Sequence, residues 1–167
     1  MARSVPSIRI FPMSERRAGF RGRGIEDVQW RVFLRDLPLK CGGRWHYQKA
    51  GLNAVPGTLV LFQFRARVIA SAVFLRDEKF ARPRQGSAGV LHFDPASFRT
   101  FAPLDAAAMR RVWPGFRAFG HVKQHLNPTL HAKFTRRLRD ISQPELVIAR
   151  RDAHDRTKTA RAKMRIR

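Results

Sequence analysis

Acidic residues are scarce in this chain: 12 Asp and Glu stand against 34 Lys and Arg among 167 residues, a formal net charge of +22. So large an excess of one sign repels itself in a compact fold. Most of the cations are arginines, whose planar fork suits phosphates and base edges. The composition therefore predicts a nucleic-acid partner, because each neutralised phosphate releases a counterion. The alternative is a basic surface that is simply solvated.

Cysteine is also scarce, since Cys41 is the only one. A single thiol excludes an internal disulfide and any zinc site built from cysteines. We therefore expect a reducing, cytoplasmic setting. Long hydrophobic runs are missing too: the longest, 58–64 and 68–75, are interrupted by Arg65 and Arg67, so neither can cross a bilayer. We expect neither a secretory signal nor a membrane partner.

Recognisable catalytic motifs are lacking as well. The sequence has no glycine-rich phosphate loop followed by Lys-Ser or Lys-Thr, no serine elbow, and no carboxylate pair at a nuclease spacing. His121 and His125 are four residues apart, but no Glu lies between them and Asn127-Pro128 follows at once. We therefore expect no metal and no other cofactor. A non-enzymatic role is favoured, although an enzyme that works with a single Asp stays open.

The sequence does have enough apolar residues for a core: 44% of the chain, with 13 Phe and 3 Trp. Three zones are predicted: an Arg- and Gly-rich flexible arm at 1–26, a folded body at 27–148 and a flexible basic tail at 149–167. From Arg150 to Arg167 there are eight basic and two acidic residues. The rest of the chain still carries +16, so the body itself is basic.

Short runs of β-branched and aromatic residues predict strands at 28–35, 58–64, 67–75, 89–94 and 97–101, and a closing strand at 146–148. The second and third strands are expected to form one hairpin, and the fourth and fifth another around Pro95-Ala96. Asp105 as an N-cap predicts a helix at 105–112, and Asn127-Pro128 predicts a second at 129–138. Together these elements predict an α+β domain in which five to six strands curl into a small barrel with two or more flanking helices.

Several of these segments resemble the PUA-like superfamily, which includes the EVE, ASCH and YTH domains. The resemblance lies in Trp45, the stretch 56–62 (PGTLVLF), the stretch 68–73 (VIASAV), Trp113-Pro114-Gly115-Phe116 and the stretch 124–128 (QHLNP). It covers roughly residues 27–138, and it departs from many relatives at Thr58, where they carry Asp. It implies a curled β-barrel that binds RNA, or that reads a modified base flipped into an aromatic pocket at the barrel mouth.

Candidate pocket residues are the three tryptophans and a few neighbours. Trp45 is the first candidate because it lies in a turn-rich segment, and stacking on an aromatic side chain stabilises an unstacked base. Asp36 would accept a hydrogen bond from an exocyclic amine of the flipped base, or it would form a salt bridge with a neighbouring arginine. Asn53 would read a base edge, or occupy a turn. The full set of candidate pocket residues is Trp45, Trp30, Trp113, Phe62, Asp36 and Asn53. For the aromatic residues, the alternative interpretation is that they pack in the hydrophobic core.

Candidate contacts to the nucleic-acid backbone are Arg44, Arg65, Arg67, Arg82, Arg84 and Lys123. The segment 82–87 is predicted to be a mobile loop that clamps a phosphate or enters a groove. We therefore predict a reader of a modified base, in DNA rather than RNA, that flips the base into a pocket near Trp45. Such readers often work in bacterial restriction or defence, with a separate or fused nuclease partner. The alternatives are an RNA-binding ribonucleoprotein component and a small base-processing enzyme, a glycosylase or nuclease.

Overall fold

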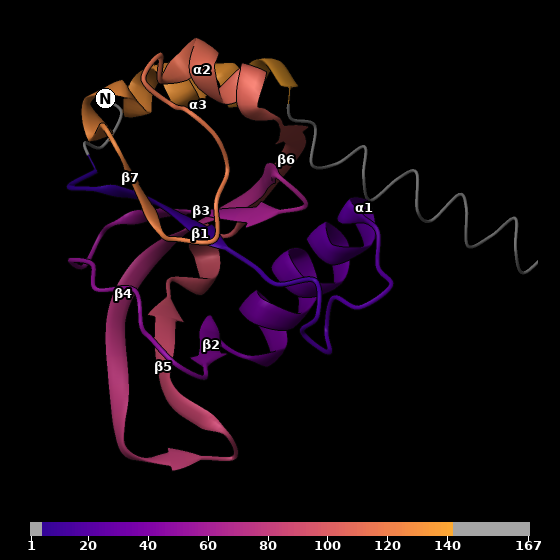
Figure 1. The fold of residues 1–167 in the computed structure, drawn as a ribbon, viewed down its shortest axis with the longest axis vertical. Helices are drawn as coiled ribbons and strands as arrows, with labels where there is room; N and C mark the ends of the chain where they lie inside the picture. Colours follow the sequence, from indigo (N-terminus) through magenta and orange to yellow (C-terminus); the bar gives the residue numbers. More distant parts are fainter. Residues whose placement is uncertain (1–4, 142–167) are drawn as a thin grey trace, which may run out of the picture.

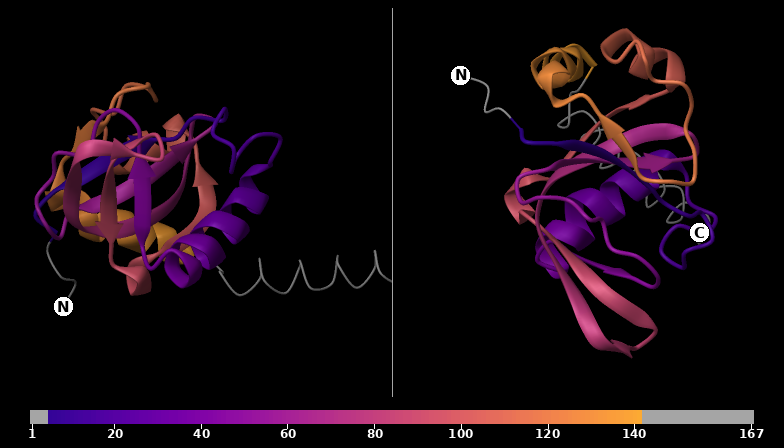
Figure 2. Two further views of the ribbon diagram at one scale, coloured as in Figure 1. Left: turned by 90° about the horizontal axis from the view of Figure 1, so that it is seen from below. Right: turned by 60° about the vertical axis from the view of Figure 1, so that its left-hand side comes forward.

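The computed structural model describes residues 5–141 and shows a single mixed sheet with helices on both of its faces (Figure 1). Seven strands follow the order β2-β5-β4-β3-β1-β7, with β6 also paired to β4. The sheet curls strongly (Figure 2), but its end strands β2 and β7 do not pair within the described residues, so the barrel does not close. The predicted α+β class is confirmed, with a curled open sheet in place of a small barrel of five to six strands.

The strands are β1 (Ile8–Pro12), β2 (Arg44–Tyr47), β3 (Leu59–Phe64), β4 (Arg67–Arg84), β5 (Ser87–Phe93), β6 (Arg99–Leu104) and β7 (Gln124–Leu126). The helices are α1 (Ile25–Val28), its wider π-type continuation η1 (Gln29–Lys40), α2 (Ala106–Val112) and α3 (His131–Ile141). Two short 3-10 turns are η2 (Pro95–Ser97) and η3 (Pro128–Leu130). The predicted strand at 146–148 and the basic tail lie outside the described residues.

The predicted hairpin of β3 and β4 is confirmed, with Leu59 opposite Val73 and Phe64 opposite Arg67. Its two-residue turn places both Arg65 and Ala66 at positive φ, the backbone that matches the twist of the strands it joins. The predicted helices also form: the Asp105 carboxylate accepts from the Ala108 N–H at the start of α2, and α3 follows η3 directly.

The predicted hairpin of 89–94 with 97–101 is wrong. β5 and β6 do not pair with each other. Both run antiparallel to β4, β6 along its first part and β5 along its second part. The Asp94 carboxylate caps η2, so the chain makes a short 3-10 turn there instead of reversing. The Ser97 hydroxyl then accepts from the Val73 N–H, which holds this junction against β4.

The strand predicted at 28–35 is also wrong, because these residues belong to α1 and η1. Val28, Phe33 and Leu37 are buried at helical spacing against the sheet. Ion pairs four residues apart join Asp27 to Arg31 and Asp36 to Lys40 on the outer side. Such pairs add to the helix, while the burial of its apolar face against the sheet outweighs the β-rich composition.

The prediction of a flexible arm at 1–26 is wrong for β1. This strand lies inside the sheet, parallel to β3 and antiparallel to β7, and Ile8 and Ile10 are fully buried. The segment that follows crosses the open side of the curl and inserts Phe20, which is 2% exposed, among the core aromatics. We call residues 13–24 the covering segment.

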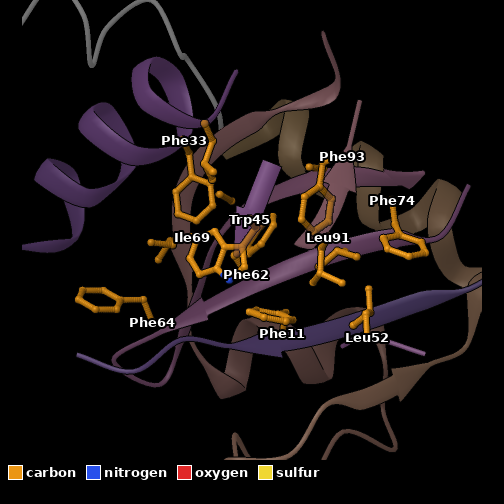
Figure 3. Close-up of a cluster of buried hydrophobic side chains, with 14 of the residues drawn as sticks. Phe11, Phe33, Trp45, Leu52, Phe62, Phe64, Ile69, Phe74, Leu91 and Phe93 are labelled. Atoms are coloured by element: carbon orange, nitrogen blue, oxygen red, sulfur yellow. The ribbon is translucent and has the colours of Figure 1, made fainter. Parts of the chain in front are cut away.

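Two cores form, one on each face of the sheet, because side chains alternate along β3. Val60, Phe62 and Phe64 enter the first core, inside the curl and against η1 (Figure 3). Leu59 and Leu61 enter the second core, beneath α2 and α3. Within the described residues, no helix has both the length and the apolar character needed to span a membrane.

Candidate nucleic-acid interface

The residues from 106 to 139 contain no Asp or Glu, but they contain eight Lys and Arg and three His. This acid-free segment comprises α2, the following loop, β7, η3 and most of α3, which gather at one end of the molecule (Figure 1). Among the described residues, no ion pair within 4 Å involves one of its lysines or arginines. Its cations are therefore not ion-paired with the described acids, although Arg110 and Lys123 donate to backbone carbonyls.

The basic residues of the helix on the other face are neutralised by contrast. Asp27 pairs with Arg23 and Arg31, and Asp36 pairs with Arg35 at 2.8 Å and with Lys40 at 3.4 Å. The hydrogen bond from Arg35 lowers the pKa of the Asp36 carboxyl, so this acid stays ionised. The net positive charge of the described molecule is thus concentrated away from η1.

A cleft of about 470 Å³ opens within the acid-free segment. It lies between the loop after α2 and the strand β7, because Pro114-Gly115 ends the helix and the Phe116 N–H closes a turn onto the Trp113 carbonyl. The volume falls in the range of pockets that hold small molecules, about 300–1,000 Å³, and is adequate for one nucleotide. The lining residues are Trp113, Pro114, Gly115, Phe116, Arg117, Gln124, His125, Leu126, Asn127 and Leu130.

Trp113 forms the inner wall of this cleft and fixes its shape. Its indole Nε1 donates to the Asn127 carbonyl at 3.0 Å, and its ring packs on Phe134 of α3. The Asn127 side chain accepts from the Thr129 backbone N–H and hydroxyl, which starts η3. The hydrogen bond from Trp113 to Asn127 therefore joins the two walls, and Arg117 and His125 also line the cleft.

The predicted pocket residues do not lie together. Trp113 belongs to the second core, whereas Trp45 and Phe62 belong to the first, on the opposite face of the sheet. Phe62 is fully buried in the centre of its core (Figure 3), and Trp30 lies half-buried on η1. Trp113 follows α2, which packs on the face of the sheet opposite Trp45 and Phe62, and the helical geometry of η1 removes Trp30 from the sheet.

Trp45 lies on β2 rather than in a turn, and it is 4% exposed. The Phe20 ring of the covering segment stacks on it at 5.9 Å with an interplanar angle of 22°. The guanidinium of Arg17, also from that segment, lies 4.2 Å from its ring centroid and donates to the His46 carbonyl. In this structure the position of a stacked base is thus occupied by the chain's own side chains.

The remaining polar candidates have local structural partners. Asp36 is paired as described, and Asn53 is exposed at positive φ (47°), consistent with a turn. Arg65 pairs with Glu15, Arg67 with Asp105 at 3.9 Å, and the Arg44 guanidinium donates to the Cys41 carbonyl. Arg82 and Arg84 are exposed near the tip of the β4–β5 hairpin.

Lys123 is half-buried and holds the loop before β3. Its Nζ donates to the carbonyls of Ala50 and Gly51 at 3.0 and 2.6 Å. Arg9 of β1, which is 9% exposed, donates to the carbonyls of Leu52 and Asn53 beside it. Burial, together with the nearby Arg9 guanidinium, lowers the pKa of the Lys123 ammonium. Both cations donate to backbone oxygens of this loop and fix it, while the buried Arg9 Nε has no partner among the described residues.

Sequence reasoning did not select Arg117, His125 or Asn127 as binding residues. The signal that could have identified them is the stretch of 34 residues without an acid, which the net charge of the whole chain does not reveal. Within the described part of the chain, no group of three His, Cys, Asp or Glu is arranged to hold a metal ion.

No protein-family model matches the sequence, and no curated protein matches it. Two solved structures are similar to the fold: the crystal structure of ASCH from Zymomonas mobilis and that of a mutant of the same protein in which one serine is replaced by alanine. The sequence identities are 11% and 10%, and the TM-scores are 0.43 and 0.45. Each comparison covers 81% of this chain and 96% of the other.

Proposed function

We propose that this protein binds nucleic acid through the acid-free segment and holds one base or nucleotide in the cleft beside Trp113. The observation that carries the proposal is a nucleotide-sized cleft within the acid-free segment, whose lysines and arginines are not ion-paired with described acids of the chain. Phosphates bound there would release counterions and supply most of the affinity, while the cleft would supply discrimination.

The shape of the cleft favours a single unstacked base over a continuous duplex. Trp113 and Phe116 contribute aromatic and apolar surface to its lining, and Gln124, His125 and Asn127 contribute polar groups. Unstacking a base costs a few kcal/mol, which contacts to the base face and edge must offset. A modified base in DNA is the ligand that we propose. Trp113 is 4% exposed, as Trp45 is, so it shapes the cleft from within the second core and only its edge is open to a base.

The charge component is tested by neutralising three exposed cations of the acid-free segment, in the variant Arg117→Ala/Lys133→Ala/Arg136→Ala. The matched control, Arg16→Ala/Arg21→Ala/Lys49→Ala, removes the same charge from three exposed positions outside the acid-free segment. We expect the first variant to weaken binding of a DNA oligonucleotide at least tenfold at fixed salt. Its plot of log affinity against log salt should become shallower by roughly 0.9 for each phosphate that is no longer neutralised. An equal loss in the control would contradict a localised interface.

The cleft component is tested by filling the cleft. Gly115 is exposed, and a Cβ there meets no atom within 4 Å, so Gly115→Phe places a ring at the rim without a backbone clash. Gly19→Phe is the control, since Gly19 is equally open but lies in the covering segment. We expect Gly115→Phe to abolish the preference for a modified over a plain oligonucleotide and to leave salt-sensitive binding intact. Preserved discrimination would contradict the cleft.

The same measurements separate the alternative functions. Tighter binding of single-stranded RNA than of every DNA probe would favour an RNA-binding component. A product formed on incubation with DNA would favour a base-processing enzyme, and either result would replace the reader proposal.

A further inference from the structure

The hairpin of β4 and β5 extends beyond the sheet as a two-stranded arm. β2 pairs with β5 only as far as Gly89, so the residues between Lys79 and Gly89 pair with one another alone. This arm, residues 79–89, projects from the end of the molecule opposite α2 and α3 (Figure 1). Residues 81–86 are all exposed.

The end of the arm is a defined structure rather than the mobile loop expected from the sequence. Gln85 and Gly86 both have positive φ, 49° and 77°, and Arg84 pairs with Ser87 across this two-residue turn. Such turns follow the natural twist of a hairpin. On the β4 side the residues 80–83 bulge from the ladder, which takes Pro83, with no N–H to donate, out of the strand pairing.

The charge of the arm is of one sign. Lys79, Arg82 and Arg84 lie on it, and no acid occurs from residue 79 to residue 93. The acids at its base are occupied: Asp77 accepts from the Tyr47 hydroxyl at 2.7 Å, and Glu78 is bonded to Arg76 and His92. The Arg84 guanidinium lies 4.9 Å from the Phe80 ring centroid, which leaves its outer edge for an anion.

The dimensions of the arm fit one kind of groove. Two paired strands lie about 4.8 Å apart, and with side chains they fit the B-form major groove, about 12 Å wide. The A-form major groove is too deep and narrow for side chains to read. We propose that the arm inserts into the major groove of double-stranded DNA, with Arg82 and Arg84 contacting guanine edges or the flanking phosphates. This inference rests on nucleic-acid binding as proposed above, but on a separate surface.

The test compares wild type with Arg82→Ala/Arg84→Ala, and with Arg16→Ala/Arg21→Ala as a charge-matched control on the covering segment. Each protein is titrated at one fixed salt with duplex DNA, duplex RNA of the same sequence, and the single strand. We expect the arm variant to lose tenfold or more in affinity for duplex DNA alone, with duplex RNA and single strand unchanged. Unfolding midpoints equal to wild type establish that the exposed substitutions leave the fold intact.

Methylation protection at guanine N7, an atom of the major groove, supplies a second measurement. Wild type and the control variant should protect guanines in the duplex, and the arm variant should not. Equal weakening on all three probes, unaltered duplex affinity, or unprotected guanines in wild type would overturn groove insertion. These outcomes are distinct from failure of the proposed function, in which wild type would bind none of the probes.

Discussion

At the scale of single residues, Tyr47 has an unusual chemical environment. It is the only tyrosine in the chain and is nearly buried at the end of β2. Its hydroxyl donates to the Asp77 carboxylate, and a Cβ on Gly89 would lie 2.3 Å from the hydroxyl oxygen. Burial, followed by the hydrogen bond to Asp77, raises the pKa of Tyr47 to about 12. The phenol therefore keeps its proton where an exposed tyrosine would lose it.

This shift predicts an alkaline loss of stability that is specific to Tyr47. Because the folded state binds the phenol proton more tightly, the stabilising contribution is complete below about pH 10, where an unfolded tyrosine titrates. It is lost as the pH rises from there through about 12. Ultraviolet titration of tyrosinate reports this residue alone and should show a midpoint near 12 in the folded protein and near 10 in denaturant. A folded midpoint near 10 would contradict the buried pair.

At the scale of elements, Gln29 attaches the η1 helix to the sheet. The ladder between β4 and β6 is interrupted between Val68 and Ala70. The carbonyls of Ile69 and Phe101 at this interruption both accept from the Gln29 Nε2, at 2.8 and 2.7 Å. A buried amide with two donors thus replaces the missing ladder bonds, and it also fixes the position of the helix start.

The variant Gln29→Leu keeps the size of the side chain and removes both donors. We expect it to lower the free energy of unfolding by about 1–3 kcal/mol, because buried carbonyls are left without partners. Urea denaturation measures this, with Gln48→Leu as an exposed control that should stay within about 0.5 kcal/mol of wild type. If both variants behave alike, the two hydrogen bonds contribute nothing to helix docking.

Helices that begin at a capping residue could be predicted from the sequence, because the cap lies next to the helix that it starts. The cap at Asp105 identifies α2, and Asn127-Pro128 identifies the start of η3 and α3. The helix at 25–40 was missed because its β-rich composition was weighted above the ion pairs of Asp27 and Asp36, four residues from their partners. That signal was readable in the sequence.

Other features depend on distant parts of the chain and were not readable. Ile8 and Ile10 become a central strand only through pairing with β3 and β7. Trp45 becomes core only because Phe20, 25 positions away, covers it. The cleft at Trp113 likewise needs β7 to return beside the end of α2. The composition alone predicted a basic surface, but not which part of that surface lacks acids.

At the scale of the whole molecule, the positive charge opposes the compact state. A net +22 on 167 residues produces self-repulsion that added salt screens over a Debye length of about 10 Å at 0.1 M. We therefore expect the thermal unfolding midpoint to rise with sodium chloride, and to rise further when a polyanion such as duplex DNA is added. Differential scanning fluorimetry measures both. A midpoint that falls with salt would show that the ion pairs of η1 outweigh the repulsion.

The position of β1 between β3 and β7 has a consequence for how the protein is made. Ile8 pairs with Leu59 on one side and with Leu126 on the other, so the earliest of the described strands to be synthesised receives its second neighbour from the latest of them. Pairing across such long stretches of chain is slow, because loop closure must precede the contacts that reward it. The sheet is therefore completed only after residue 126 has emerged. Until then the edge of β1 that later receives β7 is unpaired, and it is there that the nascent chain is exposed to aggregation and open to chaperones.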